Sequence, residues 1–170
     1  MSKKQITSKE YFKAIRLVHT AVLAGQVIFG IIGSYLGLKN MVEVADSEVE
    51  TVLLIIVSIF VFTGTITSYF LFKKSILKTK RSNNIFDKTA GYRSSLITRF
   101  AIIEGQSFFA IVAFIVAPNI VFLIYFFAML LYFLTLRPSK EKMITEFNMD
   151  PEDEKLIFND EAVISEMQIQ

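Results

Sequence analysis

The chain has 170 residues, of which 53% are hydrophobic, and its 18 Lys and Arg against 16 Asp and Glu give a formal net charge of +2. Long apolar runs and a mean hydropathy of +0.50 exclude an ordinary soluble domain. The absence of Cys excludes disulfides, thiolate zinc sites, iron–sulfur clusters and covalent haem attachment.

Four apolar runs follow one another along the chain. We place them at about 14–38, 49–72, 94–117 and 119–136, because a hydrocarbon core of about 30 Å requires roughly 20 helical residues. The first run lacks the small-residue exit of a signal peptide and is read as a retained helix. We therefore expect an all-α, polytopic membrane protein, with a four-transmembrane-helix bundle over 1–137 and an acidic cytoplasmic tail over 138–170.

The positions of Lys and Arg predict the orientation of these spans. Basic residues lie before the first span, between the second and third spans, and after the fourth span, whereas Lys39 alone lies on the opposite side. Because cytoplasmic flanks retain Lys and Arg, both termini and the loop 73–93 are predicted to be cytoplasmic. The expected location is the cell inner (plasma) membrane, with several crossings.

The first span carries small and polar residues on one helical stripe. At 100° per residue, this stripe contains His19, Gln26, Gly30, Gly33 and Gly37. Small residues let lipid-embedded helices approach closely, and occasional polar side chains bond across the interface. We expect this stripe to be a helix-packing surface, with His19 and Gln26 acting between helices.

The third span repeats part of the first. The segment 25–31 matches 105–111 at both the Gly-Gln pair and two later positions, and Ala110, Ala113 and Ala117 take the places of the three glycines. Both spans are predicted to cross from inside to outside. Two explanations stay open: two hairpins related as a parallel repeat, or chance resemblance within the few residue types that membrane helices use.

Glu104 is a carboxylate inside the third span. It follows Arg99 by about 7.5 Å of helix, and on the helical wheel it points roughly 160° away from Gln106. A charged group at the centre of a membrane helix costs about 2.5 to 3.5 kcal/mol. The carboxyl group is therefore expected to be protonated, paired, hydrogen-bonded or next to water.

Two roles for Glu104 follow from this cost. The structural one is a local tie to Arg93, Arg99 or His19 at the cytoplasmic ends of the helices. The functional one is a proton or cation site in which His19, Gln26 or Gln106 assists. Both roles stay open from the sequence.

The segment Phe100-Ala101-Ile102-Ile103-Glu104-Gly105-Gln106-Ser107-Phe108-Phe109-Ala110-Ile111-Val112-Ala113 resembles the carboxylate-bearing helix of the rotor-ring proteolipids of rotary ATP synthases. The resemblance covers one helix and implies a carboxyl group that binds a proton or sodium ion, a role that only Glu104 can take. The second span lacks the glycine ladder of the partner helix in that family. The general plan also resembles small four-span bacterial inner-membrane proteins of unassigned function.

The predicted cytoplasmic parts differ in charge. The loop 73–93 carries seven basic residues and one acid, Asp87, which favours anionic lipid head groups at the membrane surface. Because the loop is short and offers no aromatic platform of the kind on which single strands stack, nucleic-acid binding is not expected.

The tail is acidic. Asp150-Pro151-Glu152-Asp153 is a good helix start, and apolar residues on either side predict two short amphipathic helices, the second of which includes Leu156, Ile157, Val163 and Ile164. We expect the tail to dock on the basic loop or on a partner.

The sequence predicts no enzyme. A single His, no Cys and no acidic pair leave no set for acid–base, covalent or metal chemistry, so no catalytic residue, metal or cofactor is expected. The leading hypothesis is a non-catalytic inner-membrane protein that self-associates or is a small subunit of a membrane complex. The alternative is a proton- or cation-handling protein that uses Glu104.

Overall fold

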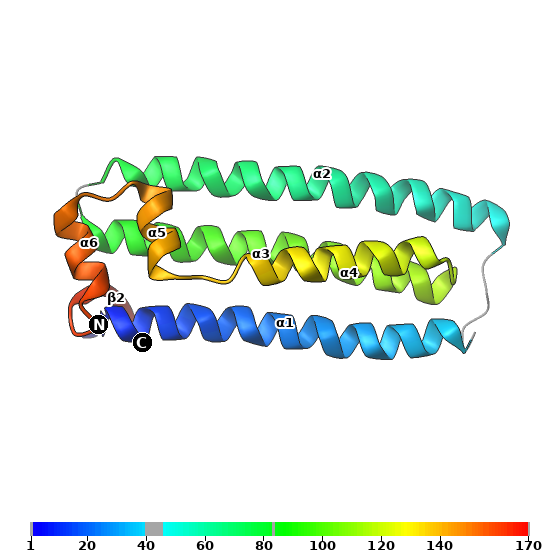
Figure 1. Cartoon of the computed structure of the whole chain (residues 1–170), viewed down its shortest axis with the longest axis horizontal. Coiled ribbons are helices and arrows are strands. Elements are labelled where there is room, and N and C mark those ends of the chain that lie inside the picture. Colours follow the sequence, from blue (N-terminus) through cyan, green and yellow to red (C-terminus); the bar gives the residue numbers. More distant parts are fainter. Residues whose placement is uncertain (1, 40–45, 83, 170) are drawn as a thin grey trace. The chain divides into compact units, whose positions relative to one another are not determined.

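The computed structural model describes residues 2–39, 46–82 and 84–169, and most of these residues are helical. The elements are β1 (Ser2–Thr7), α1 (Ser8–Leu38), α2 (Ser47–Lys80), α3 (Ile85–Val116), α4 (Ile120–Thr135), α5 (Lys140–Phe147), α6 (Pro151–Phe158) and β2 (Val163–Ile169) (Figure 1). The expected all-α class is confirmed, with one small sheet added to it.

Several helices are apolar and long enough for a membrane. Among the described residues, α1, α2 and α3 each suffice to cross one, and a fourth crossing results if α4 and α5, which are bent by 85°, are taken as one span. Alone, α4 has 16 residues, or about 24 Å of helix. The chain therefore fits a multi-pass membrane protein, and the complete four-span bundle stays a prediction.

The prediction of a long loop at 73–93 was wrong. The helix α2 continues to Lys80 and α3 already begins at Ile85, so most of the basic residues lie on helices. Lys, Leu and Ile all permit helix, and Lys78 and Lys80 in the last turn of α2 complement the helix dipole. The apolar runs identified the membrane-compatible segments, but not the ends of the helices.

The contacts divide the chain into two compact units. The terminal unit contains Met1–His19, Phe70–Thr98 and Arg137–Gln170, and the apolar unit contains Thr20–Tyr69 and Arg99–Leu136. The helices α1, α2 and α3 each contribute residues to both units. The acidic segment after 137 therefore packs together with the beginning of the chain and with 70–98.

In the apolar unit, α1 and α3 run parallel to each other. The Ser107 hydroxyl lies 2.9 Å from Gln26 Oε1, and the rings of Phe29 and Phe108 are 4.7 Å apart, so residue numbers rise together along the two helices. The two similar segments 25–31 and 105–111 lie side by side. This neighbourhood fits a parallel repeat without deciding between common origin and chance.

The other two helices of the apolar unit run in the opposite direction. The Asn119 amide at the start of α4 lies 2.6 Å from Glu50 near the start of α2, whereas the rings of Phe100 and Phe133 pair α3 with α4 in an antiparallel sense at 5.1 Å. Buried residues of α2, α3 and α4 form one core together with Ala117, which directly follows α3; the core includes Val57, Val61, Ala110, Ile111, Ala113, Phe114, Ala117, Phe122, Phe126 and Met129.

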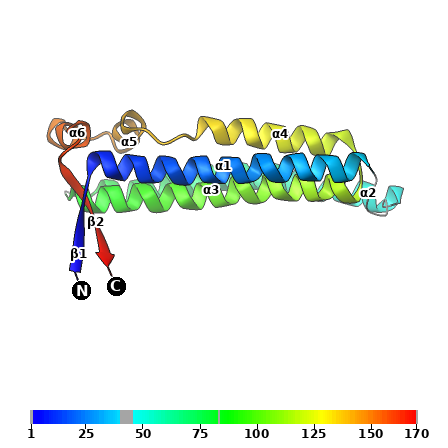
Figure 2. The same ribbon diagram turned by 90° about the horizontal axis from the view of Figure 1, so that it is seen from below.

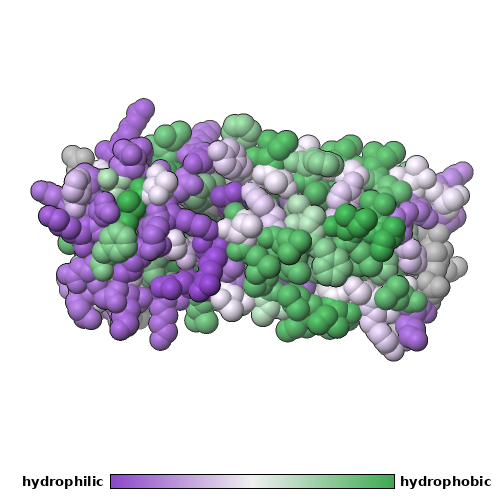
Figure 3. Space-filling model, viewed as in Figure 1, coloured by the Kyte–Doolittle hydropathy of each residue, from purple (hydrophilic) through white to green (hydrophobic). Residues whose placement is uncertain are grey.

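The surface of the apolar unit is largely hydrophobic. Figure 3 shows a wide green area over α4 and its neighbours, and large apolar side chains such as Leu131 and Phe62 are 63% and 62% exposed. In the terminal unit, hydrophilic residues dominate the same view. Apolar area on this scale would need cover in water, whereas lipid tails cover it without cost.

The two ends of the chain form a two-stranded sheet in the terminal unit. The strands β1 and β2 pair antiparallel, with Ser2 opposite Ile169 and an irregularity between Ile6 and Thr7 (Figure 2). The prediction that Val163 and Ile164 belong to a second amphipathic helix was therefore wrong. The partner strand comes from the other end of the chain, and local periodicity does not reveal it.

The two short helices of the tail are confirmed. Asp150 caps α6 by accepting from the backbone N–H groups of Glu152 and Asp153, and Pro151 opens the helix. The Tyr92 and Phe147 rings, 6.3 Å apart, pack α5 on α3. Of the two expectations for the tail, docking on the segment 73–93 is thus observed, and docking on a partner stays a prediction.

Candidate functional site

The glycine stripe of α1 lies against side chains of α3 and α4. A Cβ atom added at Gly30, Gly33 or Gly37 would come within 2.6 Å of Phe126, Ile111 or Phe114, respectively. Glycine is needed here because these side chains occupy the space of a Cβ. The aromatic rings of Phe126 and Phe114 and the branched side chain of Ile111 pack against this stripe. Ala110, Ala113 and Ala117 are fully or almost fully buried in the same unit.

Gln106 makes several polar contacts within the apolar unit. Its Nε2 atom donates to the carbonyl oxygens of Phe60 and Val61 at 3.0 and 3.1 Å, and its Oε1 atom accepts from the Thr65 hydroxyl at 3.3 Å. A Cβ at Gly64 would lie 1.9 Å from Gln106 Nε2. Gly64 therefore makes room for an amide that binds α3 to α2.

Gln26 is fully buried beside this group. Its Oε1 atom accepts from Ser107, while its Nε2 atom has no hydrogen-bond partner in the part of the chain that the structure describes. A buried donor without a partner costs about 1–3 kcal/mol. We name Gln26, Thr65, Gln106 and Ser107 the glutamine layer; it is a neutral, interior set of donors and acceptors.

Arg99 is held by two tyrosines of the apolar unit. Its Nη2 atom donates to the Tyr132 hydroxyl at 2.6 Å, and its guanidinium carbon lies 5.9 and 5.8 Å from the ring centres of Tyr69 and Tyr132. Cation–π contacts of this kind are worth more where water is scarce. The charge of Arg99 is thus stabilised by aromatic groups.

Glu104 is placed apart from these groups. Its side chain is half-exposed on the outer side of α3, and no hydrogen bond or ion pair joins it to any residue that the structure describes. A tie to Arg99, the expected partner that belongs to the same unit as Glu104, is therefore not observed. Next to it, Gly105 is exposed, with nothing within 4 Å of an added Cβ.

A shallow apolar groove adjoins Glu104. It has a volume of about 330 Å³ and is lined by Ile56, Phe60, Gly105 and Phe109, with the rings of Phe60 and Phe109 in edge contact at 5.3 Å. The groove and Glu104 are linked by Gly105, which follows Glu104 in the chain and lines the groove, and we name Glu104 and the groove together the Glu104 face. Its chemistry is a single acid beside an apolar hollow.

The predicted site residues are thus only partly brought together. Gln26 and Gln106 meet in the glutamine layer, whereas Glu104 faces outward on the opposite side of α3. His19 is buried in the terminal unit, which is not the unit of Glu104. A single site that contains Glu104, His19, Gln26, Gln106 and Arg99 is not shown, and the proton or cation role of these residues stays a prediction.

Sequence reasoning did not identify Gly64 and Tyr132 as partners of the polar residues. Gly64 is the one glycine inside the second apolar run, and that isolation was a usable signal for close approach by another group. The partnership of Tyr132 with Arg99 has no local signal, because the two residues are 33 positions apart.

Comparison with known proteins assigns the chain to no family. Comparisons with protein-family models, with curated proteins and with solved structures gave no match to the chain. The function is therefore argued from the residues and their geometry.

Proposed function

We propose that the chain is a non-catalytic integral membrane protein that self-associates, or serves as a small subunit of a membrane complex, through the Glu104 face. The observation that carries this proposal is a half-exposed carboxyl group that has no partner among the described residues and whose chain neighbour, Gly105, lines an open apolar groove. The favoured occupant of this face is a second copy of the chain.

The energetics of the carboxyl group favour an interface. A polar group in hydrocarbon without a hydrogen bond is costly, and a donor from a second copy would remove that cost. The exposed Gly105 lets another helix come close, as small residues do between membrane helices. Lipid tails alone would leave Glu104 without any partner.

The proposed setting is the cell inner (plasma) membrane, with several crossings and both termini in the cytoplasm. The pairing of β1 with β2 supports an even number of crossings, because it holds both chain ends in one sheet. The alternating helix directions within the apolar unit support the same count. The one-sided distribution of Lys and Arg supports the orientation.

The natural absence of Cys makes this orientation directly testable. Single substitutions Lys39→Cys and Arg81→Cys would be labelled in intact cells with a membrane-impermeant maleimide. Labelling of Lys39→Cys alone, with Arg81→Cys reacting only after lysis, is the expected result. The reverse pattern, or equal labelling, would contradict the proposed topology.

Self-association can be tested with a matched pair of glycine substitutions. Gly105→Leu adds bulk to the Glu104 face, whereas Gly25→Leu adds the same bulk on α1, where an added Cβ also meets nothing within 4 Å. We expect the wild-type protein and Gly25→Leu to form the same oligomer in detergent, and Gly105→Leu to be monomeric. A monomeric wild-type protein, or an oligomer that Gly105→Leu leaves intact, would reject this interface.

A second candidate is a proton- or cation-handling protein that uses Glu104. This second candidate is favoured because the Glu104 carboxyl group has no partner within the described ranges, and a titrating group must be free to exchange its proton or ion. If this second candidate is right, the protein in liposomes should show a pH-dependent proton or cation flux that Glu104→Gln abolishes. The interface proposal instead requires that Glu104→Gln, which retains a neutral hydrogen-bonding group, keeps the oligomer and that no flux occurs.

Labelling with a lipid-soluble carbodiimide between pH 5 and 9 examines Glu104 directly, since the reagent reacts with protonated carboxyl groups in apolar surroundings. Selective reaction of Glu104 that fades only above neutral pH would show an accessible neutral acid and favour proton handling. Protection in the wild-type oligomer that is lost in Gly105→Leu would favour the interface.

A further inference from the structure

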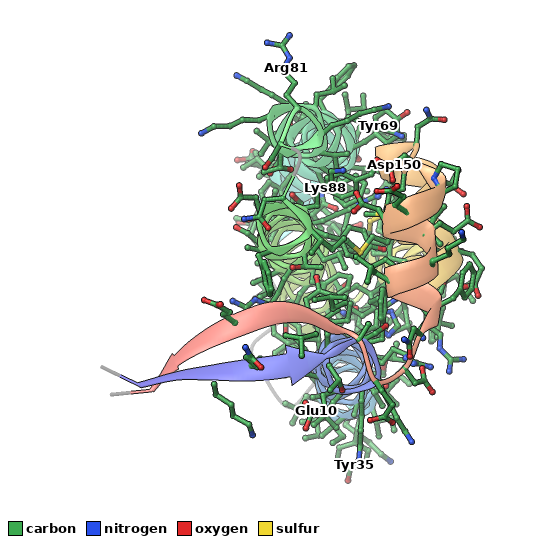
Figure 4. All side chains as sticks on the ribbon, turned by 90° about the vertical axis from the view of Figure 1, so that its left-hand side faces the viewer. Glu10, Tyr35, Tyr69, Arg81, Lys88 and Asp150 are labelled. Carbon is green, nitrogen blue, oxygen red and sulfur yellow. The ribbon has the colours of Figure 1, made fainter. Side chains whose placement is uncertain are left out.

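The two-stranded sheet of the terminal unit has one open edge on each strand. Within the part of the chain that the structure describes, β1 and β2 pair only with each other, so the far side of each strand has no partner strand there. Figures 2 and 4 show both strands extending sideways from the beginning of α1. A two-stranded sheet is marginally stable in water unless a third strand or a helix covers it. The outer part of this sheet can therefore accept another strand.

Helical residues bind both edges near the base of the sheet. On β1, the backbone N–H of Thr7 donates to the Glu10 carboxylate at 3.1 Å. On β2, the carbonyl oxygen of Ile164 accepts from the Thr89 hydroxyl at 2.8 Å, and Ile164 is fully buried. The open edges lie beyond these contacts, toward the two ends of the chain.

The two open edges differ in charge. The open part of β1, residues 2–5, contains Lys3 and Lys4, whereas that of β2, residues 166–169, contains one charged residue, Glu166, and neither Lys nor Pro. Lysine and proline on an edge strand are common means by which proteins prevent further strand pairing. The composition of β1 thus protects its edge against a third strand, and that of β2 does not.

A second copy of the chain fits the edge of β2. Two β2 strands related by a two-fold axis run antiparallel, and such an isologous contact closes after two copies. The resulting order, β1–β2–β2–β1, places lysines on both outer edges, which stops further growth of the sheet. Pairing of β1 with β2 of another copy would instead be heterologous and would leave the same two edges open, as in a fibre.

The direction of β2 suits this symmetry. Two copies with the same orientation in a membrane are related by an axis parallel to the membrane normal. Because β2 extends sideways from the beginning of α1 (Figure 2), and α1 belongs to the proposed membrane crossings, this axis reverses the direction of β2 in the second copy. Neighbouring β2 strands are then antiparallel.

A register with Gln168 at the axis separates the like charges. It places Met167 opposite Ile169 of the second copy, and both residues are uncharged. The two Glu166 residues then lie four positions apart along the strands, or about 13 Å. A register centred on Glu166 would instead bring like charges directly opposite each other, which is destabilising.

We propose that β2 pairs antiparallel with β2 of a second copy, around Gln168, and forms a four-stranded sheet. This inference rests on the proposed self-association, because so short a ladder needs the high effective concentration that another contact between the copies supplies. It adds a contact of the terminal unit to the one proposed for the Glu104 face.

The absence of Cys permits a direct test by cross-linking. In the proposed register, the two Cα atoms at position 168 are about 4.5–5.5 Å apart, which is within the range for a disulfide. Gln168→Cys is compared with Gln5→Cys, a matched change on β1, where the two copies would be separated by three strand spacings, or about 14 Å. Both variants are oxidised with copper phenanthroline in isolated membranes, and the products are separated on non-reducing gels.

We expect a disulfide-linked dimer of Gln168→Cys and none of Gln5→Cys. Adding Met167→Glu/Ile169→Glu to Gln168→Cys places acids opposite each other between the copies, whereas within one copy position 167 faces Lys4. This variant should lose the cross-link completely, while it keeps its helical circular dichroism and its oligomer in detergent.

A protein that is oligomeric in detergent but shows no cross-link of Gln168→Cys would overturn this inference and leave the proposed self-association intact. Equal cross-linking of Gln168→Cys and Gln5→Cys, a cross-link that survives the two added acids, or a cross-link to a different protein would overturn it as well. A cross-link that persists in Gly105→Leu would support the pairing of β2 and reject only its dependence on the Glu104 face.

Discussion

The terminal unit and the apolar unit stabilise their polar groups by different kinds of contacts. In the terminal unit, ionised side chains pair with each other, as Lys73 does with Glu146 at 2.5 Å, and hydrophilic residues cover the surface. In the apolar unit, the polar contacts of the glutamine layer are made by neutral amides and hydroxyls, and the surface is largely apolar. The difference shows that each unit matches its polarity to its surroundings, since water can solvate charges and lipid cannot.

Each unit also contains one polar arrangement that the other could not easily hold. Lys88 and Asp153 form a buried ion pair in the terminal unit, and Lys88 extends from α3 toward α6 in Figure 4. The apolar unit instead relies on Gln106, whose bonds to α2 carry no charge. The comparison can be tested by disrupting each arrangement.

The largest effect is expected from removing one member of the buried ion pair. Lys88→Met leaves the Asp153 carboxylate buried without its partner, which costs about 3–5 kcal/mol of stability. Thermal and denaturant unfolding in detergent, followed by circular dichroism, measure this loss. The double variant Lys88→Met/Asp153→Leu should be more stable than the single variant, because no uncompensated charge remains. A double variant as unstable as the single one would contradict this account.

A smaller loss is expected when Gly64 of the apolar unit is filled. Gly64→Ala places a Cβ on the Gln106 amide, and such overpacking costs about 1–3 kcal/mol. Gly105→Ala is the matched control on α3, where the added Cβ meets nothing; it should be neutral or more stable by up to about 1 kcal/mol, because Ala favours helix over Gly. Equal behaviour of the two variants would show that the Gln106 contact does not hold α2 and α3 together.

The cap of α4 should contribute about 1 kcal/mol. Asn119 accepts from the Val121 N–H at 2.9 Å and donates to Glu50 at 2.6 Å, so Asn119→Ala removes both bonds and should lower stability by roughly 0.5–2 kcal/mol. Asn119→Ser preserves the cap but not the bond to Glu50. Unfolding of Asn119→Ser close to that of the wild type would assign the effect to the cap, whereas a loss equal to that of Asn119→Ala would assign it to Glu50.

The smallest effect is expected from the exposed Lys140–Asp160 pair of the terminal unit. Because the folded protein lowers the pKa of Asp160, this carboxylate stabilises the folded state at pH values above its unfolded pKa of about 4. That contribution is lost as the pH falls through the lowered folded value. The melting temperature of Asp160→Asn should therefore lie slightly below that of the wild type at pH 7 and approach it near pH 3, and added salt should reduce the difference.

The sequence predicted the structure of the apolar unit better than that of the terminal unit. The apolar runs indicated the membrane-compatible helices because hydrophobicity is a local property, and the distribution of Lys and Arg between those runs predicted that α1 and α3 share a direction. The strand at Val163–Ile169 and the helical continuation of α2 to Lys80 were missed. Both lie in the terminal unit, where amphipathic segments take their structure from the partners they meet.

For the candidate site, the identity of the polar residues was readable, but their grouping was not. Gln26 and Gln106 were expected together with Glu104, His19 and Arg99, yet Arg99 meets Tyr69 and Tyr132 and Glu104 faces outward. Helical periodicity had already placed Glu104 and Gln106 on opposite sides of one helix. Which helix covers each side depends on packing between residues far apart in the chain.

The amino-acid sequence by itself determined the apolar helices, the caps at Asp150 and Pro151, and the unusual position of a carboxyl group at Glu104. These features depend on neighbouring residues, within one or two turns of helix. Only the tertiary structure decided that Glu104 has no partner in the described chain, that Gly64 accommodates Gln106, and that the two chain ends form a sheet. Each of these depends on which segments meet in space, and loop-closing contacts of that kind have no local signature.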